Sequence, residues 1–164
     1  MLFRSRVRLP AEAIRDQALA VAELLQGSIG GRSVKIEQPP GIWEAVAFPS
    51  SNTEHYVADT GDALRRRSLY TFWKRSAPPP LLTTLDAPSR ETCVLERATT
   101  TTPLQALALW NDTGMVRAAE AFGARIAAAS LAGQASDGAD AETARIAFRS
   151  EEHTSELQSQ FRIS

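Results

Sequence analysis

The sequence is poor in the residues that form most recognisable active sites. Its 164 residues include one cysteine, Cys93, and two histidines, His55 and His153. A single cysteine excludes an internal disulfide and any metal site built from several cysteines. The formal net charge is −1, so the chain has no overall field that would attract nucleic acid or an anionic membrane. These shortages exclude several classes of protein, and none of them indicates a reaction.

Long apolar runs are also missing. No stretch approaches the ~20 apolar residues that a membrane-spanning helix needs. The N-terminal string MLFRSRVRLP is too short and too charged to form a signal peptide. The hydrophobic fraction of 43% and the charged fraction of 23% are ordinary for a globular chain. The length favours one domain that is large enough to bury a core.

Two long stretches have the apolar spacing of helices that bury one face. The spacing predicts a helix over residues 11–25, because Pro10 suits a first helical turn and Gly27 suits a helix end. A second helix is predicted over residues 113–131. Its apolar positions are Met115, Ala119, Phe122, Ile126 and Ala129.

A shorter helix is predicted between these two. Thr102 is a good N-cap, Pro103 suits the first helical position, and Gln105 completes a capping box. The helix is therefore expected over residues 103–110, with Trp110 packed at its end. A further helix is expected to begin over residues 141–148.

The stretch between residues 65 and 111 also contains extended signals. Residues 68–73 are rich in aromatic and β-branched side chains, which predicts a strand, with a helix as the alternative. A second short strand is expected over residues 81–85. Residues 86–91 are typical of a helical turn that the Asp86 carboxylate caps. The expected fold class is mainly α, an irregular helical domain fragment with a short extended or β segment.

The last residues contain a string that is recognisable in itself. The string RSEEHTSELQS, residues 149–159, is similar to the translation of a common sequencing-library adapter. We therefore expect residues 1–148 to be a partial domain and residues 149–164 to be a non-native tail, which is left out of the functional interpretation. On this view the helix at residues 141–148 is cut short, and His153 carries no function.

Four residues are weak candidates for a catalytic site: Asp86, Arg90, Glu91 and Tyr70. Carboxylates beside an arginine could form an acid–base or anion site, although ion pairing and capping explain the same residues more simply. Whether the chain is an enzyme is left open.

Other constellations are weaker still. A thiol–imidazole pair of Cys93 and His55 has nothing in the sequence to bring it together. A metal site at His55 would need Glu54 and Asp59, which are more often solvated loop residues. We therefore expect no metal site and no bound cofactor in this segment.

Basic and aromatic residues allow two binding hypotheses. The run Arg65–Arg67 resembles a nucleic-acid patch only locally, so a solvated face is favoured and no nucleic-acid partner is expected. Four aromatic side chains could stack on sugar rings, but core packing is favoured for them. They are Trp43, Tyr70, Trp73 and Trp110.

Three long strings carry a resemblance to a known family. They are QPPGIWEAVAFPSSNTEHYVADTGDALRRRSLYTFWKRSAPPP, LDAPSRETC and TTTTPLQALALWND, in this order. Together they resemble a planctomycete-type domain of unknown function, the C-terminal partner domain of large secreted proteins that often also carry a cytochrome-c-like domain. The chain departs from the family pattern at Thr101, where asparagine is usual, and at Thr113, where proline is usual.

The resemblance implies a location and partners. It implies export to the periplasm or the cell surface, with haem only in a separate domain of the parent protein. It also implies contact with other domains of that protein. The first hypothesis is therefore a binding or scaffold module of a large exported, haem-associated protein. The alternative is a glycan-active enzyme domain, with glycan as the partner and the site among Asp86, Arg90, Glu91 and Tyr70.

Overall fold

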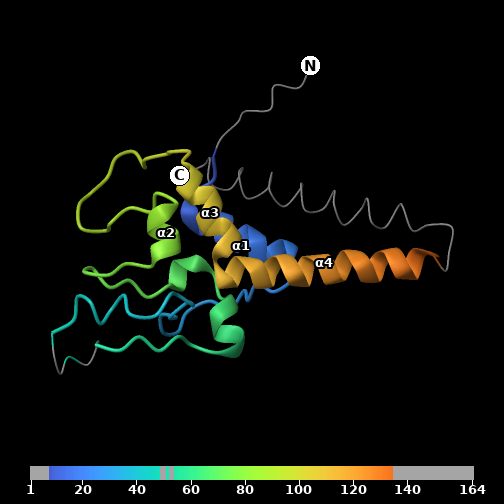
Figure 1. Ribbon diagram of the computed structural model, residues 1–164, viewed down its shortest axis with the longest axis horizontal. Helices are drawn as coiled ribbons and strands as arrows, with labels where there is room; N and C mark the ends of the chain where they lie inside the picture. Colours follow the sequence, from blue (N-terminus) through green and yellow to red (C-terminus); the bar gives the residue numbers. More distant parts are fainter. Residues whose placement is uncertain (1–7, 49–50, 52–53, 135–164) are drawn as a thin grey trace, which may run out of the picture.

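A computed structural model describes residues 8–48, 51 and 54–134. Within these residues the regular structure is helical, and β-pairing is limited to isolated bridges (Figure 1). This arrangement confirms the mainly α, irregular fold class. The elements are the α-helices α1 (Ala11–Val21), α2 (Pro80–Thr84), α3 (Pro103–Asn111) and α4 (Thr113–Gln134), and the 3-10 helices η1 (Gly61–Arg65) and η2 (Ser68–Tyr70).

Helix α1 lies at the centre of the core and contacts α2, α4 and η2. Its first half contributes Ala11 to a cluster with Leu81, Leu82 and Leu85 of the α2 region. Its second half contributes Leu19 to another cluster, which includes Ala118 of α4. The two clusters join the central helix to α2 and α4, and α3 packs on the first cluster through Ala108 and Leu109.

Helix α1 is shorter than the predicted span of 11–25, and Gly27 does not end it. It ends at Val21, and Glu23 adopts a left-handed φ of 58°. The Glu23 N–H donates to the Ala20 carbonyl and the Leu24 N–H to the Leu19 carbonyl, a common left-handed helix ending that glycine usually occupies. Burial of Leu19 with Leu24 favours this earlier turn over another helical turn.

Both predicted strands are wrong. Residues 68–70 form η2, and the chain then makes one isolated bridge between Thr71 and Val34. Ser68 has its N–H bound by Asp16, which holds the backbone in the turn. Residues 80–84 form α2 instead of a strand, because Pro80 in the first turn is preorganised for a helix.

The predicted turn over residues 86–91 is also wrong, since the helix precedes Asp86. Asp86 has a φ of 68° and ends α2 as Glu23 ends α1. Its N–H donates to the Thr83 carbonyl, and the Ala87 N–H donates to the Leu82 carbonyl. The Asp86 side chain is therefore free to bind another segment.

The helices predicted over residues 103–110 and 113–131 are confirmed. Helix α3 begins with the predicted capping box, and α4 begins two residues after α3 ends. No helix among the described residues is both long and apolar enough to span a membrane. The helix expected at residues 141–148 and the string at residues 149–159 lie outside the described residues.

Candidate functional site

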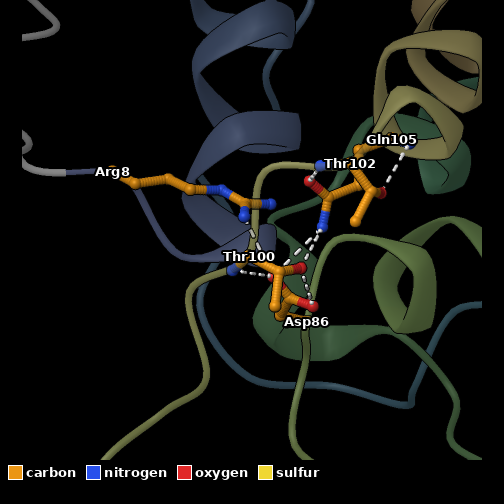
Figure 2. Close-up of polar contacts among 5 residues, drawn as sticks. All are labelled: Arg8, Asp86, Thr100, Thr102 and Gln105. Atoms are coloured by element: carbon orange, nitrogen blue, oxygen red, sulfur yellow. Dashed lines mark hydrogen bonds and ion pairs between the residues drawn. The ribbon is translucent and has the colours of Figure 1, made fainter.

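The Asp86 carboxylate is the centre of a polar cluster that joins three segments (Figure 2). Its Oδ2 accepts from the Thr100 N–H at 2.8 Å and from Arg8 Nη1 at 2.9 Å. The Thr100 hydroxyl donates to the carboxylate at 2.9 Å. Gln105 Nε2 donates to Oδ2 at 3.1 Å. The donors come from the N-terminal segment, the end of the 87–99 loop and α3.

Gln105 connects this cluster to the capping box of α3. Its Oε1 accepts from the Thr102 N–H at 3.1 Å, while its Nε2 binds Asp86 and the Thr100 hydroxyl. The Gln105 N–H in turn donates to Thr102 Oγ1. One glutamine side chain thus caps a helix and fixes that helix to the residue that ends α2.

The donors also decide the charge state of Asp86. The Thr100 N–H above all, followed by the Thr100 hydroxyl, Gln105 and Arg8, holds the pKa of the Asp86 carboxyl below its ordinary value. A carboxylate that hydrogen-bond donors keep ionised is suited to holding segments of the fold together. It is a poor proton donor at neutral pH. In this position Asp86 closes the base of the 87–99 loop.

Arg90 and Glu91 lie on that loop and have other partners. The Arg90 guanidinium lies 4.6 Å from the ring centre of Trp73, whose Nε1 donates to the Ser89 carbonyl. Glu91 makes an exposed ion pair with Arg75 at 3.3 Å. These contacts hold one edge of the loop against residues 73–75, and they do not direct Arg90 or Glu91 to the Asp86 cluster.

Tyr70, the fourth candidate, belongs to a different part of the fold. Its hydroxyl accepts from the Gly30 N–H at 2.9 Å, and the Arg66 guanidinium stacks over its ring at 4.0 Å. Arg66 also donates to the carbonyls of Arg32, Ser28 and Gly30. Tyr70 and Arg66 therefore fix the loop at residues 28–32 to η2.

The other arginines of the basic run also have partners within the fold. Arg65 Nη1 lies 3.4 Å from Asp62, and Arg67 Nε lies 3.9 Å from the buried Asp16. The three arginines of the run therefore bind different segments of the fold.

His55 and Cys93 are both exposed, and the partner of His55 is Glu44, at 3.6 Å from its Nδ1. Within the residues that the structure describes, no group of three or more His, Cys, Asp or Glu side chains is placed to hold a metal ion.

The aromatic residues divide between the core and the surface. Trp43 is buried and packs edge-on against Tyr56, with the Lys35 ammonium 5.3 Å from its ring. Trp73 packs against the α1–α2 core cluster. The prediction that Trp110 packs is wrong, because Trp110 is 82% exposed.

Trp110 belongs to a row of exposed apolar side chains on α3. Leu104, Leu107 and Trp110 are spaced by three residues and are all largely exposed, which places them on one side of the helix. The opposite side carries Ala108 and Leu109, which pack against the core. Helix α3 is therefore apolar on both sides, a pattern that is typical of a helix covered on both sides.

A cavity of about 350 Å³ lies between α1, α4 and η1. Its walls are mainly apolar, and charged side chains lie around them. The charged residues are Arg15, Glu37, Arg65, Asp112 and Arg117. Burial raises the pKa of Asp112, whose carboxylate also accepts from the Met115 N–H at the start of α4.

The sequence patterns missed the buried charged residues Arg15 and Asp16. Arg15 is 8% exposed and donates to the carbonyls of Leu64 and Arg66 and to the Ser68 hydroxyl. Burial lowers the pKa of Arg15, while Asp16 and Asp112 oppose that effect. The one available signal was position, because Arg15 lies in the same helical row as the buried Ala11 and Leu19.

Comparisons with known proteins identify a family and no closer relative. No curated protein and no solved structure matches the chain. A family profile described as PSD1, protein of unknown function (DUF1553), matches residues 1–160. The match includes the string at residues 149–159, whose adapter origin stays a prediction. Because the match covers nearly the whole sequence, this chain belongs to the PSD1 family of proteins of unknown function.

Proposed function

We propose that this chain is a binding or scaffold module of a larger exported, haem-associated protein. In this proposal the outward side of α3, formed by Leu104, Leu107 and Trp110, docks against another domain of the same protein. The observation that carries it is the exposure of all three side chains. Contiguous exposed apolar side chains mark interaction surfaces more often than single ones do.

The rigidity of α3 also supports a docking role. The capping box and the Asp86 cluster fix the first turn of the helix, and Ala108 and Leu109 anchor its inner side. A rigid helix loses little conformational entropy on binding. A large side chain that becomes fully buried contributes about 1.5–3 kcal/mol, so burial of the three side chains offsets part of the free-energy cost of association.

The choice of partner rests on the family resemblance, which implies a cytochrome-c-like domain in the parent protein. That domain offers a direct test, because haem absorbs where tryptophan emits. The purified haem domain would be added to the chain, and quenching of tryptophan fluorescence would be followed. We expect saturable quenching that Leu107→Glu weakens at least tenfold.

The matched control is Ile29→Glu, which adds the same charge at a more exposed apolar residue far from α3 in the sequence. It should bind the haem domain as the unaltered chain does. Equal binding by the Leu107→Glu variant would overturn the proposal. Sedimentation that shows a dimer abolished by Leu107→Glu would also overturn it, since the surface would then join two copies of this chain.

A further inference from the structure

The cavity between α1, α4 and η1 is separate from the docking side of α3. Its apolar walls come from four elements, α1, α2, α4 and η1, and from the segments at Leu24 and Ile36. The apolar residues are Ala18, Leu19, Leu24, Ile36, Leu64, Leu81, Met115, Ala118 and Ala121. Its volume of about 350 Å³ is at the small end of the range for small-molecule sites, ~300–1,000 Å³.

The charged groups around the cavity differ in how fully they are paired. Arg15 is turned inward, to backbone carbonyls and Ser68. Arg117 makes a close ion pair with Glu37. Asp112 is bound to the N–H of Met115, and burial favours its neutral form.

Of the three arginines that line the cavity, Arg65 has the weakest ion pairing. Its ion pair with Asp62 is long, at 3.4 Å, and Asp62 is itself mostly exposed. The Arg65 guanidinium could therefore exchange this contact for a ligand carboxylate, which would form shorter, charge-assisted hydrogen bonds.

We propose that this cavity binds a small monocarboxylate with an apolar body, such as a medium-chain fatty acid. The apolar body would lie against Leu19, Met115 and Ala118, and the carboxylate would bind Arg65 at the mouth. Two features carry the proposal: the cavity has mainly apolar walls, and a weakly paired cation lies among its lining residues. Both are independent of the α3 docking surface.

Decanoate is a suitable probe, with decanol as its neutral analogue. In calorimetric titrations of the full chain we expect saturable binding of one decanoate, with decanol at least tenfold weaker. Arg65→Gln should weaken decanoate binding at least tenfold. Arg75→Gln removes an exposed, similarly ion-paired arginine that does not line the cavity, and it should leave the affinity unchanged.

A second measurement places the ligand. The chain has two methionines, Met1 and Met115, so labelling methionine methyl groups with ¹³C gives two signals, and Met115→Leu assigns them. Decanoate should shift the Met115 signal in a saturable way. The proposal is overturned if decanoate shows no saturable binding, if decanol binds as tightly, if Arg65→Gln changes nothing, or if the Met115 methyl does not respond.

Discussion

On helix α3 a polar side chain is buried and a large apolar side chain is exposed, the reverse of the usual arrangement. On the inward side Gln105 is 6% exposed, and on the outward side Trp110 is 82% exposed. The glutamine is buried because each of its side-chain atoms that can hydrogen-bond has a partner in the Asp86 cluster and the capping box. The tryptophan is left at the surface, where water can accept from its indole N–H. Burial in this protein therefore follows hydrogen-bond satisfaction as well as hydrophobicity.

Helix α1 also buries polar side chains, and these carry charge. Arg15 and Asp16 lie inside while their donors and acceptors are bound by the 64–68 segment. If burial follows satisfied hydrogen bonds, removing the buried polar groups should destabilise the fold far more than removing the exposed apolar ones.

The largest effect is expected for Arg15→Met. This change leaves the carbonyls of Leu64 and Arg66 without their donor, and it leaves the buried Asp16 with less compensation. Removing one partner of a buried ion pair costs about 3–5 kcal/mol. Urea unfolding should show a loss of this size, and a loss below about 1 kcal/mol would contradict the view that Arg15 anchors the 64–68 segment.

Gln105→Ala should come next. It removes a donor from Asp86 and the acceptor of the Thr102 N–H, and unsatisfied buried groups cost about 1–3 kcal/mol. The same unfolding experiment measures it, with Gln38→Ala as the control, because Gln38 lies outside the cluster and its Nε2 has no hydrogen-bond partner among the described residues. If the two variants are equally stable, the Asp86 cluster does not hold α3.

The acid sensitivity of the fold should depend on Asp86. Its pKa is lower in the folded chain than in the unfolded chain, so its contribution is present above the ordinary value near ~4 and is lost as pH falls through the folded value. Asp86→Asn should therefore lower stability at pH 7 and reduce the further loss on going to pH 3.

The control for this change is Glu91→Gln, an exposed carboxylate on the same loop. It should retain the acid sensitivity of the unaltered chain. Thermal unfolding at a series of pH values measures both variants. Identical pH profiles for Asp86→Asn and the unaltered chain would show that the cluster does not depend on the Asp86 charge.

The smallest effect is expected for Trp110→Ser. Exposed substitutions away from caps and networks usually change stability by less than ~0.5 kcal/mol. The most apolar side chain of α3 should therefore contribute least to folding, although it contributes most to the proposed docking. A loss above about 1 kcal/mol in urea unfolding would mean that Trp110 packs on the fold after all.

The start of α3 was predictable because its signals are local. Thr102, Pro103 and Gln105 lie within four positions, and the capping box they predict is present. The helix ends were less predictable. Glu23 and Asp86 adopt left-handed conformations that glycine usually occupies. The search for a terminal glycine therefore placed the end of α1 too late, and Asp86 was interpreted as the cap of a following turn although it ends α2.

The site was hardly predictable, because its contacts join distant segments. Asp86 was singled out from the sequence, but Arg8 lies 78 positions away, and nothing local indicates that they meet. The strand predicted over residues 68–73 failed for a similar reason. Its aromatic residues favour extended structure, yet the N–H of Ser68 is bound by Asp16, 52 positions earlier.

Asp86 has to meet two demands at one position, and this limits what mutation can do there. A φ of 68° favours glycine, asparagine and aspartate, while four surrounding donor groups require a short side chain that only accepts. Glycine fails the second demand, asparagine turns a donor toward other donors, and glutamate is one methylene longer, which displaces its carboxylate from the four donors. A saturation library at codon 86, selected for folding alone, should return aspartate, whereas codon 110 should tolerate most residues until the chain is asked to bind its partner.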